Sequence, residues 1–209
     1  MKQIDLSLYA ITDENLIKPE NLAEAVEQAI SGGATVIQYR AKNKNSRQMY
    51  QEATVIKKVC DKYGIPLIVN DRVDIAIAVN ADGVHVGQED LDVEVVRRII
   101  GFDRILGLST KNLEQVKKAN SLPVDYIGFG SIFPTTTKEN AKVSGIETLK
   151  EVIKLSIQPV VAIGGINHKN VIEVLETGCK NVAVVSAIFG SKDVYSATKK
   201  LKAVIEKGR

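Results

Sequence analysis

The chain alternates short apolar runs with longer stretches in which apolar residues recur every three or four positions. The short runs are rich in valine and isoleucine and are bounded by glycine, proline, asparagine or aspartate, which is typical of buried parallel strands. This pattern predicts eight strands, at residues 8–12, 34–40, 66–70, 83–87, 104–109, 126–130, 159–164 and 181–186.

The longer stretches have the spacing of amphipathic helices. They predict helices over 22–30, 49–60, 93–100, 113–117, 146–153, 171–175 and 197–205. The segment 74–79 is short and apolar, and we expect a helix there because it separates two strands. Eight strand–helix units in 209 residues predict one α/β domain over 1–209, a (β/α)8 or TIM barrel, with a doubly wound open sheet as the alternative.

Composition narrows the function classes. A hydrophobic fraction of 44% and a charged fraction of 25% are those of a folded globular protein. The net charge of +3 is too small to indicate nucleic acid or an anionic membrane as partner. With no apolar run of membrane-spanning length and no signal pattern, we expect a cytoplasmic chain with Cys60 and Cys179 as reduced, mostly buried thiols. Whether it forms a homo-oligomer is left open.

In a barrel of this type, functional residues gather at the carboxyl ends of the strands. The second predicted strand ends in alternating polar residues, so Gln38, Arg40 and Lys42 share one face while Tyr39 and Ala41 take the other. An amide, a guanidinium and an ammonium group on one face favour a phosphate clamp over a merely solvated strand end.

Two carboxylates follow the third and fourth strands. Asp71 comes directly after the third strand, and Asp90 lies three residues beyond Gly87. Neighbouring strands are ~4.8 Å apart, so the two side chains are within reach of each other. Their repulsion and the absence of a His/Cys cluster favour Mg²⁺ ligation by oxygen. The alternative is that Asp71 pairs with Arg72 or caps the next helix.

A second anion site is predicted at the last three strands. The loop after the sixth strand is long and carries Thr135, Thr136, Thr137 and Lys138. Gly164 and Gly165 form a turn that we expect to start a helix with bare backbone N–H groups, and Val185 and Ser186 end the eighth strand. Ser109, at the end of the fifth strand, lies between the two anion sites.

The histidines do not indicate acyl transfer. His85 lies inside a predicted strand and is expected to be a core histidine with satisfied hydrogen bonds, and His168 is expected to be exposed. No Ser-His-Asp or Cys-His set is evident. Two other functions stay open at this point: a Schiff-base aldolase with Lys138 as nucleophile, and a phosphate sensor without turnover.

Several segments together resemble the thiamine phosphate synthase family along essentially the whole chain. They are QYRAK at 38–42, NDRVDIA at 70–76, GVHVGQEDL at 83–91, DYIGFGSIFPTTTKEN at 125–140, and the IGGI and VVSAI turns. The resemblance implies that hydroxymethylpyrimidine diphosphate is joined to a thiazole (carboxy)phosphate, with release of pyrophosphate. A related group on the same barrel, the thiazole tautomerases, is the alternative and tends to lack the complete diphosphate clamp.

The resemblance also assigns roles to residues. It implies substrate contacts for Gln38, Tyr39, Arg40, Ala41, Lys42, Asn70, Ser109, Thr135, Thr136, Thr137, Lys138, Gly165, Val185 and Ser186, catalytic roles for Arg40, Lys42, Ser109 and Lys138, and Mg²⁺ ligation for Asp71 and Asp90. Ala41 departs from the family, which commonly has an acidic residue there. Because Ala41 faces away from the clamp, we expect little consequence.

Overall fold

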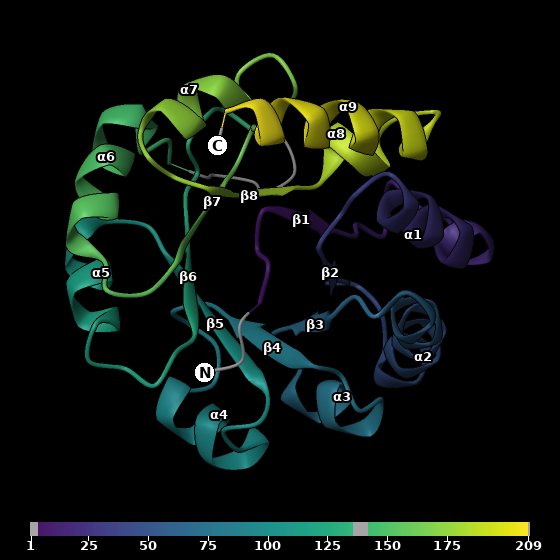
Figure 1. Cartoon of the computed structure of the whole chain (residues 1–209). Helices are drawn as coiled ribbons and strands as arrows, with labels where there is room; N and C mark the ends of the chain where they lie inside the picture. The colour runs from purple at the N-terminus through teal and green to yellow at the C-terminus, as the bar shows by residue number, and fades with distance from the viewer. Residues whose placement is uncertain (1–3, 136–141, 209) are drawn as a thin grey trace.

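Residues 4–135 and 142–208 are described by a computed structural model, in which parallel strands form a closed barrel surrounded by helices (Figure 1). The strands are β1 (Leu8–Ile11), β2 (Val36–Tyr39), β3 (Leu67–Asn70), β4 (Gly83–Val86), β5 (Ile105–Thr110), β6 (Tyr126–Phe129), β7 (Val160–Ile163) and β8 (Asn181–Val184). Each strand pairs with the next, and β8 closes the ring on β1. The predicted barrel is confirmed, and the open-sheet alternative is wrong.

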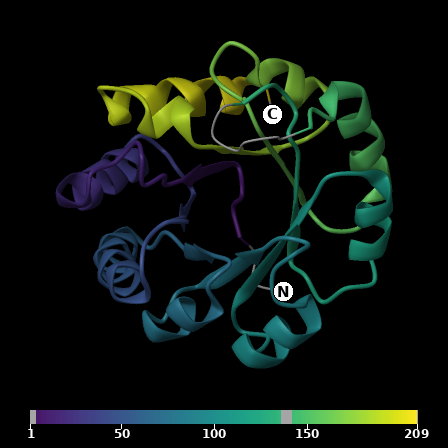
Figure 2. The same cartoon turned by 180° about the vertical axis from the view of Figure 1, so that it is seen from behind.

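Helices follow the strands and form the outer layer, as the view from behind also shows (Figure 2). They are α1 (Leu22–Ser31), α2 (Ser46–Tyr63), α3 (Val73–Ala78), α4 (Val93–Ile100), α5 (Leu113–Ala119), α6 (Gly145–Leu155), α7 (Val171–Glu176), α8 (Ser186–Phe189) and α9 (Val194–Lys207). The hydrophobic pattern does not predict α8 or the 3-10 turn η1 (Pro19–Asn21), because each is too short to show a period. Among the described residues, no helix combines the length and apolar character of a membrane span.

Local sequence sets the ends of α2, the helix behind the predicted clamp. The Asn45 side chain accepts a hydrogen bond from the Gln48 N–H (3.0 Å), and the Gln48 side chain accepts one from the Asn45 N–H (3.1 Å). This capping box satisfies two N–H groups that a helix start leaves without partners. The helix ends at Gly64, whose φ of 66° is the left-handed conformation that glycine adopts without strain.

The strand residues divide into two cores by alternation. One set packs against the buried faces of the helices and makes a continuous layer around the barrel. The other set, which includes Tyr9, Ile68, Tyr126 and Val161, forms a second cluster without helix residues and fills the barrel interior. Cys60 and Cys179 are both buried and unpaired thiols, as predicted.

Candidate active site

The end of β2 has the alternation that the sequence predicts. The Gln38 side chain is buried in the barrel interior and donates a hydrogen bond to the Tyr9 hydroxyl (2.8 Å). Tyr39 points the other way, and its hydroxyl donates to Glu52 of α2 (2.8 Å). Ala41 is also buried, among residues of the outer core. Gln38 therefore lies on the interior side, and Tyr39 and Ala41 pack toward the helices.

Arg40 is held by a carboxylate that the sequence analysis missed. Its Nη1 donates to Asp13 Oδ2 at 3.1 Å, and its backbone N–H donates to Thr12 Oγ1 at 3.1 Å. The side chains of Arg40 and Asp13 are only 20% and 7% exposed. Asp13 directly follows Thr12 at the end of β1, so the rule that polar residues gather after strands, applied to the first strand, identifies it. The guanidinium has further N–H groups for an anionic ligand.

Lys42 and the two predicted carboxylates lie together. The Lys42 ammonium forms an ion pair with Asp71, and the Asp90 carboxyl group lies close enough to Asp71 for the two to interact. Burial raises the pKa of Asp71 above its ordinary value, and the facing Asp90 raises it further, whereas Lys42 lowers it. The predicted convergence of the two carboxylates is confirmed.

The alternative interpretation of Asp71 is wrong. Arg72 pairs with Asp74, through hydrogen bonds from its Nε (2.8 Å) and its Nη2 (2.5 Å), and not with Asp71. Arg72 itself, rather than Asp71, is the residue at the start of α3. Asp71 has a φ of 60°, a left-handed conformation that aspartate tolerates better than most residues. The backbone thus turns the carboxylate toward the clamp.

The donor set at this point fits Mg²⁺. Asp71 and Asp90 supply hard oxygen ligands, and a cation between them relieves their repulsion. Within residues 4–135 and 142–208, no cluster of three or more His, Cys, Asp or Glu side chains forms a closed metal site. Mg²⁺ is bound in proteins by one or two carboxylates together with water and phosphate oxygens. The two carboxylates can therefore hold this ion, with a phosphate substrate completing its shell.

Ser109 and Asn70 lie near Asp71 and Asp90 at the strand ends. Ser109 Oγ is 2.8 Å from His85 Nε2, and its carbonyl oxygen accepts a hydrogen bond from Gln88 Nε2 (2.7 Å). Asn70 is the last residue of β3 and is in register with His85. His85 has hydrogen-bond partners at both ring nitrogens, as expected for a core histidine, and His168 is exposed.

On the other side of the barrel, the loop after β6 packs against the predicted glycine turn. Phe133 N–H donates to the Gly164 carbonyl (3.0 Å), and a Cβ on Gly165 would lie 2.4 Å from the Pro134 carbonyl oxygen. Glycine at this position is thus required by close approach as well as by its φ of 67°. The expectation that this turn starts a helix directly is wrong, because α7 begins only at Val171.

The remaining predicted residues lie at the same end of the barrel. Thr135 follows Pro134, which contacts the Gly165 position, and Val185 and Ser186 follow β8, the neighbour of β7. Ser186 is exposed. Thr136, Thr137 and Lys138 lie outside the described residues, so their predicted roles stay predictions.

Comparison with known proteins identifies the family of this chain. The family model described as thiamine monophosphate synthase matches residues 8–188. The chain is 67% identical to a thiamine-phosphate synthase of Persephonella marina over 206 residues, which is 99% of each sequence. It is 50% identical to thiamine-phosphate synthase 1 of Aquifex aeolicus over 199 residues, covering 95% of this chain and 93% of that one.

A solved structure extends the agreement to three dimensions. Thiamine phosphate pyrophosphorylase from Pyrococcus furiosus superposes with a TM-score of 0.89 and 43% sequence identity, over 97% of this chain and 96% of that one. Identity of this level over nearly full length shows an enzyme of the same transferase type. The chain belongs to the thiamine monophosphate synthase family.

Proposed function

We propose that this enzyme joins hydroxymethylpyrimidine diphosphate to thiazole phosphate or its carboxy form, producing thiamine phosphate and pyrophosphate. The observation that carries the proposal is the cluster at the ends of β2, β3 and β4, where Lys42 pairs with Asp71, Asp90 lies near Asp71, and Arg40 precedes Lys42 by two residues after β2. Cations next to paired carboxylates are suited to a diphosphate and its divalent ion. Family membership supports the same substrates.

In the proposed reaction, the bond between the pyrimidine methylene carbon and the diphosphate oxygen breaks. The electron pair leaves with pyrophosphate, and the lone pair of the thiazole nitrogen then forms the new carbon–nitrogen bond. Arg40 and Lys42, with Lys138 by the family resemblance, stabilise the negative charge that grows on the departing oxygen. The thiazole nitrogen carries no proton to lose, so the step needs no enzymic base.

Asp71 and Asp90 would hold Mg²⁺ in this reaction. When bound, the ion would neutralise charge on the diphosphate oxygens. Because Lys42 pairs with Asp71, its ammonium group lies where it can contact a diphosphate bound to an ion at these carboxylates. Asp71 therefore has two roles, to help bind the ion and to position Lys42.

The thiazole phosphate is assigned to the opposite side of the barrel mouth. Thr135, the Gly165 turn and Ser186 lie at the ends of β6, β7 and β8, where barrels of this type usually bind phosphate. Ser109, on β5, lies between this region and the diphosphate clamp. Two anionic substrates thereby have separate places on one rim, so that the nitrogen of one can reach the methylene of the other.

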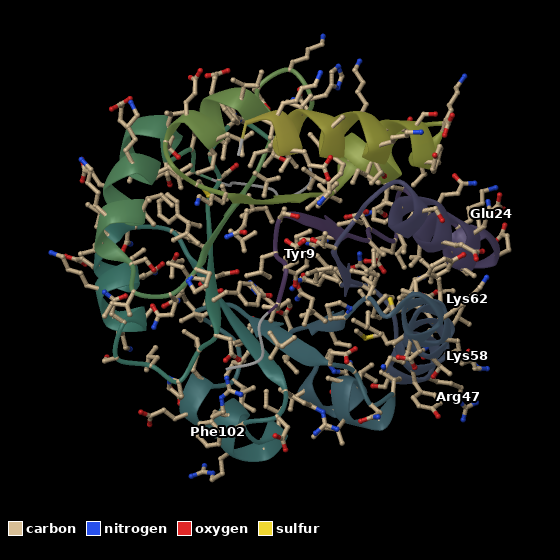
Figure 3. All side chains as sticks on the ribbon, viewed as in Figure 1. Tyr9, Glu24, Arg47, Lys58, Lys62 and Phe102 are labelled. Carbon is tan, nitrogen blue, oxygen red and sulfur yellow. The ribbon has the colours of Figure 1, made fainter. Side chains whose placement is uncertain are left out.

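The direct test is to incubate the enzyme with both substrates and Mg²⁺ and to measure thiamine phosphate and pyrophosphate. We expect product with Mg²⁺, loss of activity with EDTA, and a decrease in kcat/KM of roughly tenfold or more for Arg40→Ala, the cost of one charge-assisted contact. Lys62→Ala is the control, since Lys62 is exposed on the outer face of α2 (Figure 3). No product under these conditions, or normal kinetics in Arg40→Ala, contradicts the proposal.

A further inference from the structure

A chain of polar side chains crosses the interior of the barrel and ends at Ser109. Gln38 Nε2 is 2.8 Å from the Tyr9 hydroxyl, which is 2.8 Å from the Tyr126 hydroxyl. The Tyr126 hydroxyl is 2.9 Å from His85 Nδ1, and His85 Nε2 is 2.8 Å from Ser109 Oγ. Figure 3 shows Tyr9 inside the ring of strands. The chain therefore links β2 to β5 across the barrel by hydrogen bonds.

The barrel interior has the space that this hydrogen-bonded chain of side chains requires. Interiors of such barrels are mostly filled by branched apolar residues, and a buried polar network is costly unless every member is satisfied. Here two glycines make the room: a Cβ on Gly107 would lie 2.2 Å from Tyr126 Cζ and 2.4 Å from His85 Nδ1, and one on Gly128 would lie 3.2 Å from His85 Cε1. Both phenols are fully buried, and burial raises their pKa values, so they remain neutral.

The hydrogen bonds of the chain can run in only one direction. The amide nitrogen of Gln38 donates and cannot accept, so the Tyr9 oxygen is the acceptor there. Tyr9 has one proton, which it donates to Tyr126, and Tyr126 in turn donates to His85 Nδ1. In the reverse direction, the buried Tyr9 O–H would face two donors and have no acceptor in the chain, which costs free energy.

We infer that His85 is a positioning residue that accepts a hydrogen bond at Nδ1 and carries its proton on Nε2, which donates to Ser109 Oγ and leaves the Ser109 hydroxyl proton to donate toward the barrel mouth. The Ser109 hydroxyl thus selects a hydrogen-bond acceptor, such as a ring nitrogen of a heteroaromatic substrate. The identity of that substrate as the aminopyrimidine rests on the proposed function. The Gln88 side chain, which donates to the Ser109 carbonyl, fixes the backbone at the same residue (2.7 Å).

The tautomer of His85 is measurable in the ligand-free protein by NMR with ¹⁵N-labelled histidine. The protein has two histidines, His85 and His168, so the spectrum of a His168→Gln variant identifies the signals of His85. We expect His85 at neutral pH to show a protonated Nε2 and an unprotonated Nδ1. Tyr126→Phe removes the donor to Nδ1 and should give a mixture of tautomers. Tyr9→Phe, the matched loss of a buried hydroxyl, leaves the Tyr126 donor in place and should keep the Nε2–H form.

The inference is overturned by a wild-type His85 with its proton on Nδ1 or on both nitrogens, a result that needs no variant. It is also overturned if Tyr126→Phe leaves the tautomer unchanged. In kinetics, His85→Leu should lower kcat/KM roughly tenfold, as for one lost hydrogen bond, and His85→Gln, which restores an N–H donor, should recover part of the loss. Equal losses in both variants contradict the role.

These outcomes separate the inference from the proposed function. Because the tautomer is measured without substrate, a correct tautomer in a protein that makes no thiamine phosphate refutes the proposed function alone. A wrong tautomer in a protein that does make thiamine phosphate refutes the positioning role alone.

Discussion

Asp13 positions Arg40, and its substitution tests whether the clamp depends on this buried ion pair. The change is Asp13→Asn, which keeps the size of the side chain. The amide oxygen of the new side chain can still accept the hydrogen bond that Asp13 Oδ1 receives from the Asn15 N–H (2.9 Å). The other side-chain position then presents an NH₂ group to the Arg40 guanidinium in place of the carboxylate oxygen at 3.1 Å. Two donors face each other, so the contact is lost.

The expected loss of stability follows from the burial of the Asp13 carboxylate and the Arg40 guanidinium group. A hydrogen bond between charged groups contributes about 1.5–3 kcal/mol. Asp13 is 7% exposed and Arg40 is 20% exposed, so the pair is shielded from water, yet Arg40 keeps some hydration and does not incur the full cost of an isolated buried charge. We expect the free energy of unfolding to fall by about 1.5–3 kcal/mol, which lowers Tm by roughly 3 to 12 °C for a chain of this length.

The same substitution should affect substrate binding. Without Asp13, the substrate has to order the Arg40 side chain, whose rotamer entropy amounts to ~2 kcal/mol. We therefore expect KM for the pyrimidine diphosphate to rise by roughly tenfold while kcat changes less. The assay combines urea unfolding of Asp13→Asn, Arg40→Met and the double variant with steady-state kinetics of the single variants. Asp103→Asn, at an exposed position, is the control for the change of charge.

The double-mutant cycle decides the outcome. The reasoning requires a coupling free energy between positions 13 and 40 of about 1.5–3 kcal/mol. A coupling below ~0.5 kcal/mol, or an Asp13→Asn enzyme with wild-type stability and KM, would refute the view that Asp13 holds Arg40.

Two further predictions concern the metal site and the thiols. Mg²⁺ at about 100 times its Kd should stabilise the wild type by about 2.7 kcal/mol, measured as a rise in Tm. The Asp71→Asn variant should lose this rise, and asparagine tolerates the left-handed φ of 60° at that position. Asp74→Asn, a change at an exposed position, should keep the rise. An undiminished rise in Asp71→Asn contradicts the ligand assignment. Burial raises the pKa of Cys60 to about 12 and raises that of Cys179, so neither should react with iodoacetamide at mildly alkaline pH until the protein is unfolded, as mass spectrometry would detect. Rapid labelling of the native protein contradicts this expectation.

Much of the site could be predicted from the sequence, because it depends on the ends of strands. Side chains alternate along a strand whatever the strand packs against, so the opposite directions of Gln38 and Tyr39 follow from local sequence. Asp71 and Asp90 follow neighbouring strands, and the spacing of parallel strands is enough to bring them together. The helical period over 171–175 predicted the start of α7, but the separation of the glycine turn from that helix was not accessible in this way, because the residues between Gly165 and Val171 show no period that distinguishes a turn from a first helical turn.

Local periodicity was enough to predict the order and approximate bounds of the eight strands and the longer helices, and the opposite faces of the residues at the end of β2, since these depend on patterns within a few residues. Which distant side chains meet depends instead on how the whole sheet folds. Asp13 and Arg40 are 27 positions apart, and Tyr9 and Tyr126 are 117 positions apart on strands that are not neighbours in the barrel. The two tyrosines meet across the interior because the sheet closes on itself, and closure depends on the tilt and stagger of all eight strands together.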